Sequence, residues 1–221
     1  MSMSEYSGHV DPQGPAASRL VALPGGADVE IKKFSVGPYD NNVYLLTDRH
    51  SGRALLIDAA NDADRILEEV KDVEVAAIVT THGHSDHWQA LDQVADATGA
   101  PTYLHPDDRA MVPRPSDCIA EDEQRVLFGS AEVTLLHTPG HTPGSTCVLL
   151  GDRHLFSGDT LFPGGPGNTF GSADAFEQIM RSLRERLFVL RDDAWVYPGH
   201  GDDTTIGRER PHLDEWQQRG W

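Results

Sequence analysis

The chain has 221 residues, of which 38% are hydrophobic, and this is enough apolar material for the core of one sizeable domain. Its formal net charge of −17 repels phosphate backbones and anionic lipid head groups, so we expect neither nucleic acid nor a membrane as a partner. No apolar run reaches the roughly 18 residues of a membrane-spanning helix, no signal peptide is recognisable, and the two cysteines cannot form a disulfide framework. We therefore expect a cytoplasmic protein that acts on a small molecule. The sequence makes no prediction about the oligomeric state.

Residues 1–28 contain glycine, proline and serine but few apolar residues, which predicts an irregular N-terminal arm. Residues 29–221 are predicted to form a single domain that ends in a short helical tail, beginning near Thr205. Short apolar runs bounded by turn residues predict strands, and apolar residues at helical spacing predict helices. The predicted strands are 29–36, 43–47, 53–57, 75–79, 101–104, 125–128, 132–136, 145–150, 154–156 and 195–197, and the predicted helices are 63–71, 88–98 and 174–190.

The densest group of potential metal ligands is one short segment, His82-Gly83-His84-Ser85-Asp86-His87. It lies directly between the predicted buried strand 75–79 and the predicted helix 88–98. Side chains at such a strand-to-helix turn point into a crevice, and imidazole and carboxylate groups are common ligands of transition metals. The segment therefore predicts a metal centre.

Three further candidate ligands, His141, Asp159 and His200, each follow a predicted strand and lie beside glycine. Glycine lets the backbone turn tightly, so that these side chains can reach a shared crevice. Asp159 can bridge two metals, because each of its carboxylate oxygens can bind one of them. His137 precedes a Pro-Gly turn and is expected beside a ligand rather than as one. The first predicted ligand set is His82, His84 and His141, and the second is Asp86, His87 and His200.

Three protein ligands for each metal leave an open coordination position, which characterises a catalytic rather than a structural site. Two metals held in this way would bind and deprotonate a bridging water, and the resulting hydroxide would attack a carbonyl carbon. The metals would also stabilise the oxyanion that forms. Asp86 could steer protons near this water, so we count it as a catalytic residue as well as a ligand. The pattern therefore predicts a metal-dependent hydrolase.

The ligand pattern as a whole, from His82 through His87 and then His141, Asp159 and His200, resembles the metallo-β-lactamase superfamily. This resemblance extends from about residue 29 to residue 210 and implies a four-layer αββα sandwich, with a dinuclear site along one edge of its two sheets. Within the superfamily the chain is similar to the glyoxalase II group, which hydrolyses thioesters such as S-lactoylglutathione. The segments that carry this similarity are 158–162, 197–201 and 204–209.

Our leading prediction is a dinuclear zinc-dependent hydrolase of a small thioester or ester, with iron or manganese as alternative metals. A persulfide dioxygenase that uses one iron remains an alternative, because such enzymes resemble this family and two histidines with one carboxylate suit non-haem iron. A lactonase of acyl-homoserine lactones shares the full ligand set and is the third alternative. The candidate substrate-binding residues are Trp88, Phe162, Asn168, Phe170 and Arg208. Trp88 could equally be a core residue, and Arg208 could form a structural salt bridge.

Overall fold

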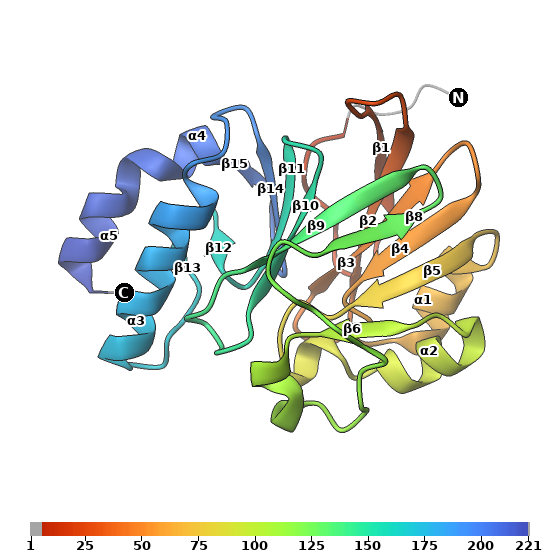
Figure 1. Ribbon diagram of the computed structural model, residues 1–221, viewed down its shortest axis with the longest axis horizontal. Helices are drawn as coiled ribbons and strands as arrows, with labels where there is room; N and C mark the ends of the chain where they lie inside the picture. The colour runs from red at the N-terminus through yellow and green to blue at the C-terminus, as the bar shows by residue number, and fades with distance from the viewer. Residues whose placement is uncertain (1–5, 221) are drawn as a thin grey trace.

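The computed structural model describes residues 6–220. Two β-sheets pack face to face, and helices cover the outer face of each sheet, so that the chain forms four layers in the order αββα (Figure 1). This architecture confirms the predicted fold class. None of the helices between residues 6 and 220 is long and apolar enough to cross a lipid bilayer.

The first sheet has seven strands that lie side by side in chain order, with an antiparallel meander from β1 to β4 and parallel pairing from β4 to β7. Its outer face is covered by α1 (Ala63–Val70) and α2 (Leu91–Thr98). Two short 3-10 helices, η1 (Ser85–His87) and η2 (Pro106–Met111), lie in its connections. The strands are β1 (Ala17–Ala22), β2 (Asp28–Val36), β3 (Asn41–Asp48), β4 (Arg53–Ile57), β5 (Glu74–Val79), β6 (Thr102–Leu104) and β7 (Cys118–Ile119).

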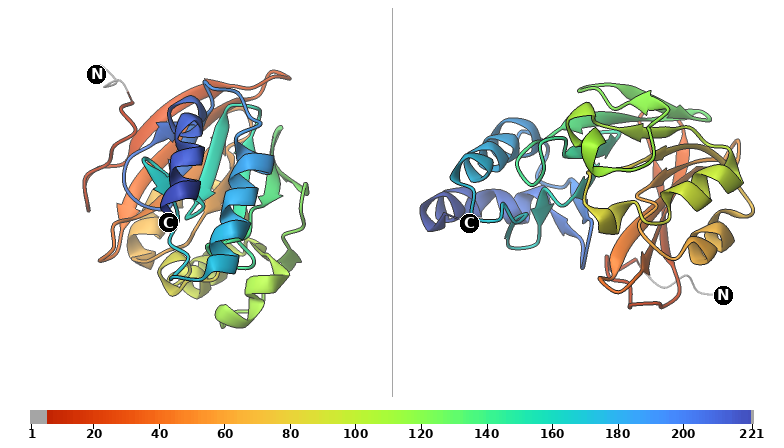
Figure 2. Two further views of the ribbon diagram at one scale, coloured as in Figure 1. Left: turned by 90° about the vertical axis from the view of Figure 1, so that its left-hand side faces the viewer. Right: turned by 90° about the horizontal axis from the view of Figure 1, so that it is seen from below.

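The second sheet has six strands in the order β15-β14-β11-β10-β9-β8, and only the β11–β14 pair is parallel. Helices of the second half lie against its outer face (Figure 2). Its strands are β8 (Arg125–Phe128), β9 (Ala131–His137), β10 (Thr146–Leu150), β11 (His154–Gly158), β14 (Trp195–Pro198) and β15 (Thr204–Thr205), and β12 (Leu161–Phe162) and β13 (Gly165–Pro166) form a separate hairpin. The helical segments are α3 (Ala173–Ser182), the π-helix η3 (Leu183–Leu187), α4 (Ile206–Glu209), η4 (Arg210–His212) and α5 (Leu213–Arg219).

The alternation of side chains along β3 shows how the layers are held together. Tyr44 and Leu46 pack into the core between the two sheets, whereas Val43 and Leu45 face the core beneath α1 and α2. Successive side chains of a strand point to opposite faces of its sheet, so a strand between two covered faces must be apolar on both. β3 is accordingly buried along its whole length.

The prediction of an irregular arm over residues 1–28 was wrong for Ala17–Ala22, which form β1 and pair with β2. This strand lies at the edge of the sheet and has only one buried residue, Val21, so it lacks the apolar pattern by which strands are recognised. Residues 6–16 contain no helix or strand, and residues 1–5 of the predicted arm lie outside the described residues. The short strand β7 was also not predicted, whereas the helical tail is present as α4 to α5.

Candidate metal centre

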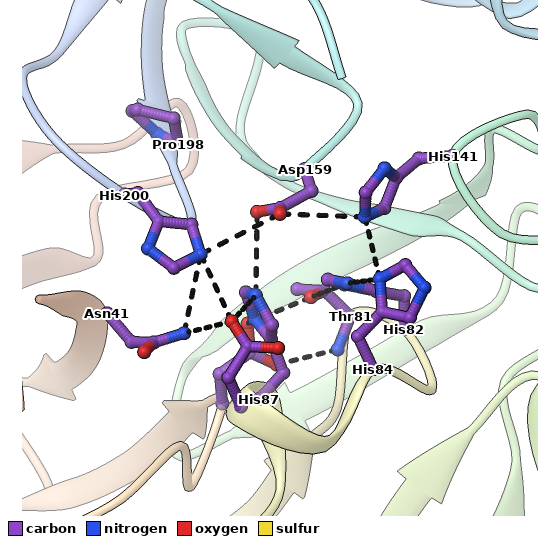
Figure 3. Close-up of polar contacts among 12 residues, drawn as sticks. Asn41, Thr81, His82, His84, His87, His141, Asp159, Pro198 and His200 are labelled. Carbon is purple, nitrogen blue, oxygen red and sulfur yellow. Dashed lines mark hydrogen bonds and ion pairs between the residues drawn. The ribbon is translucent and has the colours of Figure 1, made fainter. Parts of the chain in front are cut away.

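The predicted ligands come from both sheets and meet at one edge of the sandwich (Figure 3). The segment from His82 to His87 follows β5, and His141 lies in the turn between β9 and β10. Asp159 follows β11, and His200 follows β14. Since β11 and β14 run parallel, their carboxyl ends deliver Asp159 and His200 to the same edge. The structure thus brings all seven predicted ligand residues together.

The first predicted ligand set is formed by three ring nitrogens. Nε2 of His82 lies 3.1 Å from Nδ1 of His84, which lies 2.8 Å from Nε2 of His141. A tetrahedral zinc ion with Zn–N bonds of about 2.0–2.1 Å would hold its ligand atoms roughly 3.3 Å apart. The three nitrogens are therefore grouped closely enough to bind one ion.

The second predicted set has similar spacing. Oδ2 of Asp86 lies 3.5 Å from Nε2 of His87 and 3.3 Å from Nε2 of His200. Asn41 donates a hydrogen bond from Nδ2 to the same aspartate oxygen at 2.9 Å and so fixes the orientation of this carboxylate.

Asp159 lies between the two sets, as expected of a bridging carboxylate. Its Oδ1 is 3.5 Å from Nε2 of His87, and its Oδ2 is 3.5 Å from Nε2 of His141 and 3.7 Å from Nε2 of His200. Within residues 6–220, Nε2 of His87 and Oδ1 of Asp159 are buried without any hydrogen-bond partner. Buried polar atoms that lack a partner cost roughly 1–3 kcal/mol each, and a cation between them would remove this cost.

Four of the five histidines are oriented by a hydrogen bond from Nδ1, which leaves the Nε2 lone pair facing the centre. The Nδ1–H group of His141 donates to the carbonyl oxygen of Asn168 at 2.8 Å, and that of His200 donates to the carbonyl oxygen of Tyr39 at 3.0 Å. Such partners fix the tautomer and the ring orientation of a metal ligand. Nδ1 of His82 lies 3.1 Å from the hydroxyl oxygen of Thr81, and Nδ1 of His87 lies 2.9 Å from Oδ2 of Asp58.

Asp58, at the end of β4, organises this inner network and was not among the predicted site residues. Its Oδ2 accepts hydrogen bonds from Nδ1 of His87 at 2.9 Å and from the Thr81 hydroxyl at 2.8 Å, and its Oδ1 accepts from the Thr81 backbone N–H at 2.7 Å. Asp58 therefore supports His87 directly and His82 through Thr81. Its position at the carboxyl end of a parallel strand was the signal in the sequence that could have identified it.

The charges of the centre favour a divalent cation. Burial together with the neighbouring histidines lowers the pKa of His82 well below its usual value, and burial also lowers the pKa of His84 and His141, so these rings are neutral and free to act as ligands at neutral pH. Burial opposes protonation of His87 too, but the Asp58 and Asp159 carboxylates outweigh it and raise the pKa to about 10. The carboxylates thus attract positive charge into a buried site, which a metal ion supplies.

Asp108 in η2 joins two of the ligand loops and was also not predicted. It is fully buried and accepts hydrogen bonds from the N–H groups of Gly83 and Gly144, each at 2.7 Å, and from the Thr142 hydroxyl at 2.6 Å. A Cβ atom at Gly144 would lie 2.6 Å from Cγ of Asp108, so glycine is required for this close approach. Asp108 therefore holds the loop of His82 to His87 against the turn that carries His141.

A second buried network holds the loop that carries His200. The Asn42 side chain donates to the carbonyl oxygens of Pro198 and Gly201, both at 2.9 Å. Nζ of Lys33 donates to the same Gly201 oxygen at 2.8 Å and forms an ion pair with Asp203 at 2.7 Å. Residues of β2 and β3 in the first sheet thus position a ligand loop of the second sheet.

The predicted substrate-binding residues lie in different places. Trp88 packs against the core beneath α1 and α2, and its indole N–H donates to the carbonyl oxygen of Gly83 at 2.8 Å, so it supports the ligand loop. The Phe162 ring is 6.5 Å from the His200 ring, and the Phe170 ring is 5.6 Å from the His84 ring. Arg208 instead lines a surface hollow of about 460 Å³ around α4 and α5. The backbone carbonyl of Asn168 accepts the hydrogen bond from Nδ1 of His141, a predicted ligand.

His105, Asp107 and His137 form another group of potential ligands outside the centre. The His105 and His137 rings are stacked, with centroids 3.8 Å apart and planes inclined by 10°. A metal binds an imidazole in the plane of the ring, and two parallel planes at this separation do not share such a point. Nε2 of His137 instead donates to the carbonyl oxygen of Pro143 at 2.9 Å, next to the turn of His141.

The αββα sandwich is a fold that binds divalent metal ions, and its histidine and aspartate clusters lie at one edge of this protein. A sequence model of the metallo-beta-lactamase superfamily matches residues 36–200, and the chain belongs to this superfamily. An uncharacterized protein from Aquifex aeolicus is 35% identical over 198 residues, which cover 81% of this chain and 93% of the relative. The hydroxyacylglutathione hydrolase GloC from Haemophilus influenzae is 29% identical over 206 residues, covering 82% and 95% of the two chains.

Solved structures with the same fold are similar over most of the chain. The B3 metallo-beta-lactamase BLEG-1 matches with a TM-score of 0.76 and 29% identity, and the match covers 83% of this chain and 97% of the BLEG-1 chain. ETHE1 from Myxococcus xanthus has a TM-score of 0.75 and 29% identity, with coverages of 83% and 82%. A di-iron-bound form of TTHA1623 has a TM-score of 0.69 and 31% identity, with coverages of 80% and 96%.

Proposed function

We propose that this protein is a metal-dependent hydrolase of a small thioester or ester, with one divalent ion in each ligand set and Asp159 between them. The observation that carries this proposal is the pair of unpartnered buried atoms, Nε2 of His87 and Oδ1 of Asp159, at the meeting point of the two sets. Zinc suits these nitrogen and oxygen ligands, and iron or manganese are the alternatives. The similarity to a hydroxyacylglutathione hydrolase supports the thioester class.

Bound ions of this kind supply a water of lowered pKa and polarise a carbonyl oxygen. The chain itself orients the ligands through Asp58, Asn168 and the Tyr39 carbonyl, so that little reorganisation is needed during the reaction. Asp86 is the more exposed of the two predicted carboxylate ligands, with 25% of its side chain accessible against 12% for Asp159. This greater exposure supports the proposal that Asp86 steers protons near the water.

A persulfide dioxygenase is the second candidate, and the similarity to ETHE1 supports it. It would need one iron per chain, bound by histidines and a carboxylate with open positions for substrate and oxygen. The two candidates differ in metal count, metal identity and oxygen consumption, so they can be separated without knowledge of the natural substrate. Cleavage of acyl-homoserine lactones remains a variant of the hydrolase proposal.

The test begins with elemental analysis of the purified protein, where two metal ions per chain are expected. A panel of thioesters, esters, lactones and β-lactams then measures hydrolysis, and an oxygen electrode measures turnover of glutathione persulfide. Asp159→Ala should lose metal and hydrolysis together, whereas the exposed control Asp152→Ala should keep both. One iron per chain with oxygen uptake would overturn the hydrolase proposal in favour of the dioxygenase. Full activity of Asp159→Ala would refute the bridging assignment.

A further inference from the structure

Exposed apolar side chains gather around the metal centre. The described residues include seven large hydrophobic side chains that are exposed, and two of them, Met111 and Phe170, contact the ligand segments. Phe170 is 69% exposed and Met111 is 38% exposed. Exposure of such residues at one place marks a surface that binds an apolar partner or ligand.

Phe170 is held in this position by its own loop. Its φ of +54° lies in the left-handed region, which bulky residues avoid because of the steric cost. The Asn168 side chain accepts a hydrogen bond from the Phe170 backbone N–H at 2.7 Å and stabilises this conformation. The ring consequently stands over two ligands, with its centroid 5.6 Å from that of His84 and 5.9 Å from that of His141.

The other apolar side chains adjoin the remaining ligand segments. Met111 packs against Gly83, where an added Cβ atom would lie 2.7 Å from Cβ of Met111. The Phe162 ring is 6.5 Å from the ring of His200. Apolar groups therefore border both ligand sets. We call Met111, Phe162 and Phe170 the apolar rim.

In the part of the chain that the structure describes, lysine and arginine side chains do not neutralise the carboxylates of the centre. Within residues 6–220, the carboxylates of Asp58, Asp86 and Asp159 form ion pairs only with histidines, and no lysine or arginine pairs with them. A carrier with free carboxylates, such as glutathione, would need cations to compensate its desolvation. The net charge of −17 adds a general repulsion.

We propose that the apolar rim binds the acyl chain of the substrate, and that the hydrolase acts on thioesters or esters of uncharged, medium-length acyl groups. This inference rests on the proposed hydrolase function. An acyl chain that lies against Phe170 and Met111 is removed from water beside the ligand sets, with its carbonyl group over the centre. Each methylene buried in this way should raise kcat/KM about three- to fourfold until the rim is filled.

The test uses the metal-replete protein and two series of substrates, N-acetylcysteamine thioesters and p-nitrophenyl esters with acyl groups from acetyl to octanoyl. The wild-type protein should prefer the longer chains, and S-octanoylglutathione should be a poorer substrate than the N-acetylcysteamine thioester. Phe170→Ala should reduce the octanoyl-to-acetyl ratio of kcat/KM at least about tenfold, mainly through KM, and Phe170→Leu should retain much of the ratio. The matched control Leu127→Ala removes an exposed side chain on β8 and should leave the ratio unchanged.

Metal content of Phe170→Ala equal to that of the wild type would show that the ligand sets are intact. Hydrolysis without any dependence on chain length, or an unchanged ratio in Phe170→Ala, would overturn the apolar-acyl inference alone. A preference for the glutathione carrier would also contradict it. Absence of hydrolysis of every substrate by the metal-replete wild type would overturn the hydrolase function and this inference with it.

Discussion

Lys33 connects the N-terminal arm to the loop of His200, and its replacement by methionine tests this connection. The side chain is fully buried, and Nζ donates to the carbonyl oxygens of Gly8 and Gly201, each at 2.8 Å, and to Asp203 at 2.7 Å. The Tyr6 hydroxyl donates to the other oxygen of Asp203 at 2.7 Å. Lys33→Met keeps an unbranched side chain that is one atom shorter, but it removes the charge and all three donors.

Removing one partner of a buried ion pair leaves an uncompensated charge, which typically costs about 3–5 kcal/mol. For a domain of this size, each kcal/mol lowers Tm by about 2–4 °C, so a decrease of roughly 6–20 °C is expected. Burial already raises the pKa of Asp203 in spite of the opposing effect of Lys33, so the stranded carboxyl can take up a proton at lower pH. The loss of stability in Lys33→Met should therefore be smaller at pH 5 than at pH 8.

Urea and thermal unfolding of the metal-loaded proteins measure this effect. The adjacent residue provides the control, because Lys32 is partly exposed and pairs with Glu69 at 3.2 Å, so Lys32→Met should cost less than about 1 kcal/mol. The double variant Lys33→Met/Asp203→Leu should recover part of the loss, since no buried charge remains. A free energy of unfolding for Lys33→Met within about 1 kcal/mol of the wild type would refute the reasoning.

Three further predictions concern the ligand supports and the core. Asp58→Asn removes the carboxylate that orients His87, so metal affinity should fall about 10- to 100-fold in a competition titration with a chelator; unchanged affinity would contradict this role. Burial lowers the pKa of His154 from 6.5 to about 4, so the folded state excludes a proton that the unfolded chain binds, and about 3 kcal/mol of stability should be lost as pH falls from 6.5 to 4. His154→Gln should abolish this part of the pH dependence in urea unfolding. Gly140→Ala would place Cβ 2.4 Å from Cβ of Ile179 in α3, so Tm and metal content should fall together, and a wild-type Tm would refute the clash.

Sequence reasoning predicted the grouping of the candidate ligands because each ligand segment follows a predicted strand and contains or adjoins a glycine. The αββα class followed from the same motif through the resemblance to a known superfamily. Asp58 and Asp108 were missed because their importance comes from contacts with residues more than twenty positions away, His87, Thr142 and Gly144. These pairings depend on how the sheets place the loops, so the position of Asp58 after a predicted strand was a signal for that residue but did not reveal its partners.

The predicted substrate-binding residues also show that position in the sequence does not determine where a side chain points in the fold. Phe162, Asn168 and Phe170 were selected because they follow Asp159 in a glycine-rich loop, and all three lie near the centre. Trp88 was selected by its position next to a ligand, but a residue that follows a turn can face either side, and here the ring packs into the core. Tyr39 was not selected, because only the tertiary fold places its turn beside His200.

The order of the ligands along the chain has a consequence for biosynthesis. The first sheet is complete at Ile119, whereas the last predicted ligand, His200, follows β14 and meets Asn41 of β3 only after the second sheet has folded. A ribosome therefore exposes His82 and His84 well before their partners exist. A metal ion that needs ligands from both halves of the chain could therefore be held stably only after residue 200 has left the ribosome and the second sheet has folded.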